Sequence, residues 1–191
     1  MLHTEKKKKE IPRAFKMQEK EKLFSLRKAC MVNAIDLIKE SEILYKKRRY
    51  ARAFALAFTS FEEVSKHQIV SDYITEVASK EEFQSAFKYH NIKVAYSNIK
   101  IRVGAYIELN NKAKTSDATL LYDLGAGAKT LSLRNKSLYV EYTDNLKIIE
   151  PRISFKAKDA KEMIETVKKR IGYILFAEKF NGRIGTRALI K

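Results

Sequence analysis

The residues of this chain best suited to chemistry are two adjacent carboxylates and the basic groups that follow them, in the segment Phe61–His67. An alanine-rich run typical of a helix leads into this segment. Residues three or four apart are neighbours on a helix, so we expect Lys66 beside both Glu62 and Glu63. His67 is expected beside Glu63 for the same reason. These side chains are either a structural group of ion pairs or half of an active site.

A second candidate segment begins at Arg134 and reads Arg-Asn-Lys-Ser-Leu-Tyr-Val-Glu-Tyr. Arg134 can hold a phosphate through two donors, Asn135 can orient it, and Tyr139 can donate a phenolic proton. In the structural alternative, Arg134 is buried and paired with one of the two glutamates of the first segment. On a continuous helix Arg134 and Tyr139 point about 140° apart. They therefore converge on one ligand only if the helix ends near Leu138.

The histidines and the cysteine give no support for a metal site. His3, His67 and His90 do not cluster with Cys30, so the zinc patterns are absent. A di-metal carboxylate bundle would need Glu-x-x-His pairs on two helices, and none is present. We therefore expect no metal and no cofactor. His90 lies on an apolar stripe, where a hydrogen-bonded core histidine is commoner than a catalyst, and Cys30 is expected in the core.

Composition and charge favour a helical protein with a polyanionic partner. The 191 residues are 45% hydrophobic and 32% charged, with only six glycines and two prolines, which favours long helices. The net charge of +16 raises the local concentration of polyanions, so a nucleic acid, RNA or DNA, is the expected partner. No apolar run approaches the roughly 20 residues that a membrane span needs, and the N-terminus is too polar for a signal peptide. Together with the single cysteine, these features predict a cytoplasmic protein with no membrane partner.

Apolar periodicity predicts an all-α, up-and-down bundle of four to five helices. The first two helices should form an antiparallel hairpin, because the turn between them is short. Ser79 and Glu82 have the spacing of a capping box that opens the third helix. Gly125 and Gly127 should kink or break the fourth helix. The helices are expected over residues 23–49, 50–78, 80–111, 117–139 and 156–180, with a long connection over 143–155.

One domain with two basic ends is expected. Residues 1–20 form a basic arm, either flexible or the frayed start of a helix, residues 21–180 form the helical domain, and residues 181–191 form a basic tail. Phosphate contacts are expected from Lys6–Lys9 and Lys46–Arg49. The third helix is apolar on two faces, which predicts a partner subunit and hence a homodimer.

Three motifs follow one another along the chain. Ala53–Lys66 reads A-x-x-L-A…E-E-x-x-K, Phe87–Lys93 reads F-x-x-H-x-x-K, and Arg134–Glu141 reads R-x-x-x-L-Y-V-E. In this order, with Pro151 following at about the expected distance, they resemble the signatures of AbiV-type abortive-infection proteins, a branch of the HEPN superfamily. The resemblance covers about residues 25–155.

The resemblance implies a bundle that dimerises and brings two copies of the arginine motif into one cleft. Many HEPN proteins are metal-independent endoribonucleases, in which an R-x4-6-H motif supplies a phosphate-holding arginine and a histidine acid/base for attack by the RNA 2′-hydroxyl. Here R-x4-H counted from Arg134 lands on Tyr139, and R-x6-H lands on Glu141. One alternative is that His67 or His90 substitutes from another helix. The others are that Tyr139 or Glu141 acts instead, or that the protein binds RNA without cutting it.

The first hypothesis is therefore a dimeric HEPN-like defence protein that acts on RNA as a metal-independent endoribonuclease. Its candidate site residues are Arg134 for gripping phosphate, Glu63, His90 and Tyr139 as acid/base or orienting groups, and Asn135, Lys66 and Lys93 for substrate binding. The alternative is a non-catalytic RNA- or protein-binding helical dimer whose polar residues hold the helices together. A basic scaffold or regulatory subunit is a third interpretation. An antitoxin or regulatory protein is a further candidate partner, which the sequence does not name.

Overall fold

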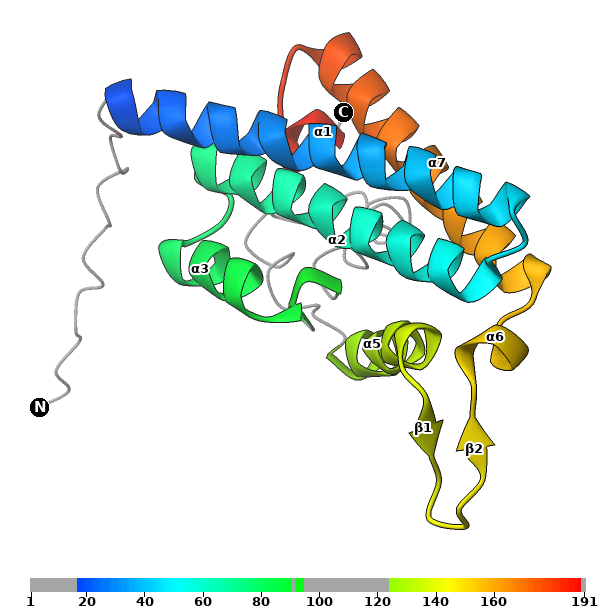
Figure 1. Cartoon of the computed structure of the whole chain (residues 1–191). Helices are drawn as coiled ribbons and strands as arrows, with labels where there is room; N and C mark the ends of the chain where they lie inside the picture. The colour runs from blue at the N-terminus through cyan, green and yellow to red at the C-terminus, as the bar shows by residue number, and fades with distance from the viewer. Residues whose placement is uncertain (1–16, 91, 95–123, 190–191) are drawn as a thin grey trace, which may run out of the picture.

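The computed structural model describes residues 17–90, 92–94 and 124–189 and shows a bundle of helices (Figure 1). Three long helices pack together: α1 (Met17–Lys46), α2 (Tyr50–Ile74) and α7 (Ala157–Asn181). Two shorter helices, α3 (Lys80–Lys88) and α5 (Leu124–Leu138), lie along α2 on its side away from α1. The predicted all-α bundle is confirmed.

The α1–α2 hairpin is the predicted one, and only Lys47–Arg49 separates the two helices. Serine hydroxyls and alanines at the contact let the helices approach closely. Ser41 Oγ donates to the Ala53 carbonyl at 2.6 Å. Ser60 Oγ donates to the Ala34 carbonyl at 2.6 Å. The core that α7 completes includes large buried side chains from all three helices, among them Ile38, Phe54, Phe58, Val64, Val167, Ile171 and Ile174. Each such side chain stabilises the fold by about 1.5–3 kcal/mol when fully buried.

Helix α3 begins at the predicted capping box but ends earlier than predicted. Ser79 Oγ accepts from the Glu82 N–H at 3.1 Å, and the Glu82 carboxylate accepts from the Ser79 N–H at 2.7 Å. The prediction of one helix over 80–111 is wrong at Tyr89, whose extended backbone (φ −109°, ψ 125°) ends α3. Helical backbone returns at residues 92–94. The rest of the predicted helix, with most of its two apolar faces, lies outside the described residues.

Helix α5 is unbroken over Leu124–Leu138, so the kink expected at Gly125 and Gly127 is not found in it. Both glycines fall in the first turn, where the backbone N–H groups have no intrahelical partners to lose. The start predicted at residue 117 lies outside the described residues. The end predicted at about Tyr139 is confirmed to within one residue, since α5 ends at Leu138.

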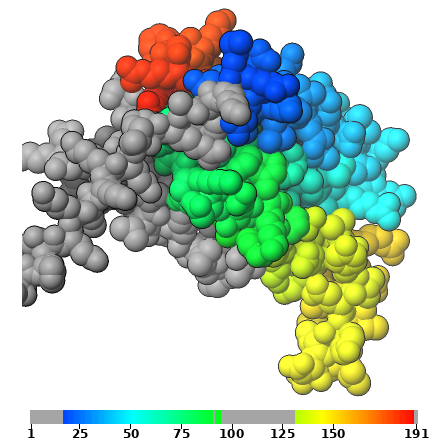
Figure 2. Space-filling view, turned by 90° about the vertical axis from the view of Figure 1, so that its left-hand side faces the viewer, coloured from blue at the N-terminus to red at the C-terminus, as the bar shows by residue number. Residues whose placement is uncertain are grey.

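The long connection expected before the last helix contains a small hairpin and one helical turn. Strand β1 (Glu141–Tyr142) pairs antiparallel with β2 (Ile148–Ile149), and α6 (Pro151–Ser154) follows. Pro151 suits the first position of α6, where its missing N–H is not needed. The hairpin projects from the body of the bundle (Figure 2).

The last described residues pack against the bundle as the short helix α8 (Thr186–Leu189). Ala188 is fully buried, and both glycines between α7 and α8, Gly182 and Gly185, have left-handed φ angles of 60° and 68°. Glycine adopts this conformation without the steric cost of a Cβ atom, so the chain can turn back onto α2 there. Among the described helices, none is long and apolar enough to cross a membrane.

Candidate functional site

Charged side chains from three parts of the chain gather against the middle of α2, in what we call the Glu62 cluster. Its members are Glu62, Glu63 and Lys66 of α2, His90 and Lys93 after α3, and Arg134 of α5. Helical spacing places the α2 residues together, whereas the other three arrive through tertiary packing of α3 and α5 on α2. The structure thus brings together all but two of the site residues predicted from the sequence, the exceptions being Tyr139 and Asn135.

The centre of the cluster is a carboxylate–imidazole pair. The Glu62 side chain is only 4% exposed, and its Oε1 lies 2.8 Å from His90 Nδ1. His90 is 45% exposed, so it is not the core histidine that its apolar stripe suggested. A carboxylate accepts the proton of Nδ1, which leaves Nε2 of the neutral ring with its lone pair directed elsewhere. The His90 imidazole is therefore exposed at the surface, and the buried carboxylate of Glu62 fixes its orientation.

Glu63 and Lys66 form the predicted ion pair one helical turn apart. The ammonium of Lys66 also lies 5.9 Å from the centre of the Phe87 ring. Burial raises the pKa of the neighbouring Cys30 thiol to about 11, and the negative charge of Glu63 acts in the same direction. Cys30 is buried as predicted, and it is an unreactive thiol rather than a nucleophile.

Lys93 brings a buried positive charge to the cluster. Its residue is 6% exposed, and burial lowers the pKa of its ammonium below the ordinary value. The positive charge of Lys66 lowers that pKa further, and Arg134 does so more weakly. The carboxylates of Glu62 and Glu63 act in the opposite direction. Lys93 thus lies close enough to Lys66, Glu62, Glu63 and Arg134 for their charges to change its pKa.

Arg134 has an uncommitted donor. Its Nε is buried and has no hydrogen-bond partner among the described residues. The structural ion pair considered for Arg134 is not found within the described part of the chain, because Glu62 pairs with His90 and Glu63 with Lys66. A buried donor without a partner costs about 1–3 kcal/mol. Because Arg134 has no anionic partner in the described part of the protein, its guanidinium can bind an anion from a ligand.

Tyr139 and Asn135 lie apart from these contacts. Tyr139 is 62% exposed, and its N–H still donates to the Asn135 carbonyl at 2.9 Å, one residue beyond the end of α5. Although α5 ends near Leu138, as convergence would require, the Tyr139 N–H keeps its helical hydrogen bond and no contact joins Tyr139 to Arg134 within the described residues. Within the described residues, neither the phenol nor the Asn135 amide has a hydrogen bond to the Glu62 cluster.

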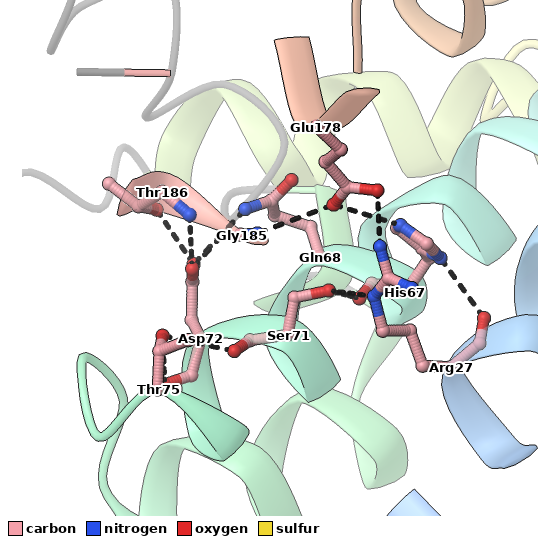
Figure 3. Close-up of polar contacts among 9 residues, drawn as sticks. All are labelled: Arg27, His67, Gln68, Ser71, Asp72, Thr75, Glu178, Gly185 and Thr186. Carbon is pink, nitrogen blue, oxygen red and sulfur yellow. Dashed lines mark hydrogen bonds and ion pairs between the residues drawn. The ribbon is translucent and has the colours of Figure 1, made fainter. Parts of the chain in front are cut away.

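His67 belongs to a second polar group, which also includes Arg27, Asp72 and Glu178 (Figure 3). The predicted contact with Glu63 is not found: His67 Nδ1 lies 3.0 Å from the Arg27 carbonyl and Nε2 lies 3.4 Å from Glu178 Oε1. The side chain is 2% exposed. With both ring nitrogens engaged and no access to solvent, His67 holds α1, α2 and α7 together.

The same group fastens the end of the chain to α2. Glu178 forms an ion pair with Arg27 and accepts from the Gly185 N–H at 3.3 Å. Burial alone would raise the pKa of Glu178, but hydrogen bonds and charges from His67 and Arg27 outweigh it and lower the pKa to about 2. The buried Asp72 accepts from both the backbone N–H and the hydroxyl of Thr186, the latter at 2.8 Å (Figure 3).

The arrangement of the Glu62 cluster suits acid–base chemistry on an anionic substrate. It combines the exposed, oriented imidazole of His90 with the buried cation of Lys93 and with the Arg134 guanidinium, whose Nε has no hydrogen-bond partner among the described residues. No group of three or more His, Cys, Asp or Glu side chains in the described residues is arranged to hold a metal ion.

Sequence reasoning missed the role of Glu62, for which it expected Lys66 as the partner. The error arose because helical spacing predicts neighbours on one helix and says nothing of a residue that another helix delivers. A signal was present in the sequence, since His90 is an ionisable residue on the same apolar stripe as Phe83 and Phe87. A buried carboxylate needs such a partner.

Comparison with known proteins places the chain in a family. A family model described as AbiV, of the HEPN class, matches residues 22–172 of the chain. No curated protein and no solved structure matches it. The matched region contains every residue of the Glu62 cluster.

Proposed function

The chain belongs to the AbiV family of HEPN domains, which makes it an abortive-infection defence protein, and we propose that it acts on RNA as a metal-independent endoribonuclease. The Glu62 cluster is the proposed active site. His90 takes the place of the histidine that the arginine motif lacks, and Arg134 and Lys93 supply positive charge to the scissile phosphate.

The proposed reaction is attack by a ribose 2′-hydroxyl on the neighbouring phosphate. Nε2 of neutral His90 takes the hydroxyl proton while O2′ bonds to phosphorus and the P–O5′ bond breaks. The products are a 2′,3′-cyclic phosphate and a 5′-hydroxyl whose proton comes from water, and the protonated His90 returns its proton to the hydroxide that this leaves. Arg134 and Lys93 stabilise the charge that develops on the phosphoryl oxygens. Glu62 is a positioning residue, because it holds the imidazole through Nδ1.

The observation that carries this proposal is the 2.8 Å contact between a buried Glu62 carboxylate and the exposed His90 ring. A carboxylate that is hydrogen-bonded to one ring nitrogen of an imidazole fixes the orientation and the tautomer of the ring. Of the two histidines in the described residues, only His90 has an accessible ring, since His67 is enclosed. Between the two histidines that the sequence left open, the accessible ring supports His90 as the proposed acid/base group.

Growth arrest with RNA breakdown tests the proposal in cells. We expect the wild-type chain and Tyr139→Phe to arrest a bacterial host on expression and to fragment its RNA. His90→Gln and Arg134→Gln should express at the same level without either effect. Arrest by His90→Gln equal to the wild type would refute the assignment, and loss of arrest in Tyr139→Phe alone would transfer the role to Tyr139.

Dimerisation is part of the proposal. HEPN proteins act as dimers in which two sites share a cleft, and the family assignment supports the same assembly here. Light scattering at micromolar concentration should give twice the chain mass of 22.1 kDa. A monomer at every concentration would remove the shared cleft. An antitoxin or other regulatory protein remains a candidate partner, and copurification from the native host would identify it.

A second candidate function is RNA binding without cleavage. The observation in its favour is that the residue at the motif position of the histidine, Tyr139, is 62% exposed and has no hydrogen bond to the Glu62 cluster among the described residues. In this case the Glu62 cluster would bind an RNA phosphate without cleaving the RNA. Binding of RNA by the wild type with no cleavage over hours would favour this function.

A further inference from the structure

A basic groove lies at the end of the bundle, where the α1–α2 turn meets the end of α5 and the start of α6. It has a volume of about 830 Å³. The charged residues lining it are five cations and one acid: Lys47, Arg48, Arg49, Arg52, Arg152 and Glu150. All five cations are exposed, and none of them has an ion-pair partner among the described residues. Unpaired positive charges that lie close together create a positive potential, so the groove attracts anions.

Three of these arginines occupy positions where the backbone favours other residues. Arg48 has a left-handed φ of 58° in a Schellman motif, with its N–H bonded to the Tyr45 carbonyl at 2.9 Å and the Arg49 N–H bonded to the Leu44 carbonyl at 2.9 Å. Glycine is the usual residue at that position. Arg49 is the N-cap of α2 and forms no side-chain cap.

Arg52, in the first turn of α2, adds a third conflict, because cations are unfavourable at the positive end of a helix. The capping geometry of the turn and the N-terminus of α2 therefore call for none of the three arginines, although the negative C-terminal end of α1 favours a cation at Arg48 and Arg49. Residues kept against local preference are expected where a function needs their side chains.

The groove also has an apolar surface between its cations. Tyr50, Leu138, Val140 and Pro151 contribute to its lining. A surface that combines cations with an aromatic ring and aliphatic side chains suits single-stranded nucleic acid, whose phosphates follow the charges and whose bases pack on the apolar part. A small inorganic anion would use only a fraction of such a volume.

The groove and the proposed active site share the helix α5. Ser137 lines the groove and is 1% exposed, and its hydroxyl donates to the Arg134 carbonyl at 2.6 Å. Three residues of helix separate them, a rise of about 4.5 Å. An RNA chain that crosses the Glu62 cluster at Arg134 can therefore extend along the end of α5 into the groove.

We propose that this groove binds the phosphate backbone of single-stranded RNA on one side of the cleavage site. The inference rests on the proposed function and adds a substrate-binding surface outside the Glu62 cluster. It makes the protein select unpaired RNA, since a duplex keeps its bases from the apolar lining.

The test is the salt dependence of binding to a fluorescently labelled single-stranded RNA of about 12 nucleotides, measured by anisotropy on the catalytically inactive His90→Gln chain. In that background we compare Arg48→Gly/Arg52→Gln/Arg152→Gln with a control that removes the same charge from exposed sites far from the groove. The control substitutes glutamine at Lys20, Lys28 and Lys179. Each phosphate contact in a single strand contributes about 0.7 to the log–log salt slope, so the groove variant should lower the slope by about 2.

Arg48→Gly by itself separates binding from folding. It removes a side chain from the groove and a left-handed non-glycine residue from the turn, so RNA binding should weaken while the melting temperature stays equal or rises. A fall in both would mean that Arg48 serves the fold, and would count against the proposal.

Each outcome decides the matter. A lower slope in the groove variant with an unchanged control supports the groove. Equal losses in both variants, or no loss in either, overturn it while leaving RNA binding by the protein established. Absence of RNA binding by the starting chain overturns the proposed function and the groove together. A polyglutamate peptide of the same length that binds as tightly as the RNA would assign the groove to an acidic protein partner and overturn the RNA assignment.

Discussion

Replacing Arg134 by alanine should leave the fold nearly as stable as the wild type while removing the proposed phosphate grip. Removing one member of a buried ion pair costs about 3–5 kcal/mol, because the other charge is left uncompensated. That cost does not apply here. Within the described residues Arg134 forms no ion pair, and Glu62 and Glu63 are paired with His90 and Lys66.

Two smaller effects remain at Arg134, and they oppose each other. Losing the methylene stem of a half-buried side chain costs at most about 2 kcal/mol, at about 0.8 kcal/mol per fully buried CH₂. Removing a buried Nε without a partner recovers about 1–3 kcal/mol. The repulsion between Arg134 and Lys93 also disappears. The free energy of unfolding should therefore fall by no more than about 1 kcal/mol.

Urea unfolding followed by circular dichroism measures this change, and Arg27→Ala is the matched control. Arg27 forms an ion pair with the buried Glu178, so its removal should cost about 3–5 kcal/mol. RNA cleavage should be lost in Arg134→Ala and kept, at temperatures where the chain is folded, in Arg27→Ala. A loss of 3 kcal/mol or more in Arg134→Ala would show that Arg134 is a structural residue and refute the reasoning.

Three further results are expected from the structure. Gly185→Ala should destabilise the protein by at least about 1 kcal/mol, because a Cβ atom there would lie 2.3 Å from Asp72 Oδ1 and the residue has a left-handed φ. Gly172→Ala is the control: its Cβ would have nothing within 4 Å, so thermal melting should show a neutral or stabilising change. Because the pKa of Glu178 is lowered from 4.5 to about 2, its stabilisation is complete above pH 4.5 and is lost as the pH falls toward 2; it amounts to at most about 3 kcal/mol, less after solvent screening. Acid unfolding of Glu178→Gln should lack this component. Cys30, with a pKa of about 11, should react with iodoacetamide at pH 8 only after denaturation, as mass spectrometry would show.

The helices that the sequence predicted well are those whose signals are local. The capping box at Ser79 and the apolar periodicity of α7 each depend on residues within a few positions of one another. The end of α3 at Tyr89 could not be read in this way, because no glycine or proline marks it. Neither could the hairpin of β1 and β2, whose strands are only two residues long.

The candidate site was predictable in its residues more than in its pairing. The motif residues Glu63, His90 and Arg134 were named from their types and order, and α2, α3 and α5 bring them together. Their partners depend on how the helices pack, which spacing along the chain does not determine. The basic groove illustrates the same limit, since Arg152 is a hundred residues beyond Arg52 in sequence and lines the same cavity.

The central claim is that His90, oriented by Glu62, is the acid/base group of a ribonuclease. The most direct test incubates the purified chain with single-stranded RNA in EDTA and identifies the new ends. The account predicts cleavage that leaves 2′,3′-cyclic phosphates, a rate at least about 100-fold lower in His90→Gln with an unchanged melting temperature, and an intermediate rate in Glu62→Gln. Cleavage by His90→Gln at the wild-type rate, or no cleavage by a dimeric wild type that binds the RNA, would contradict it.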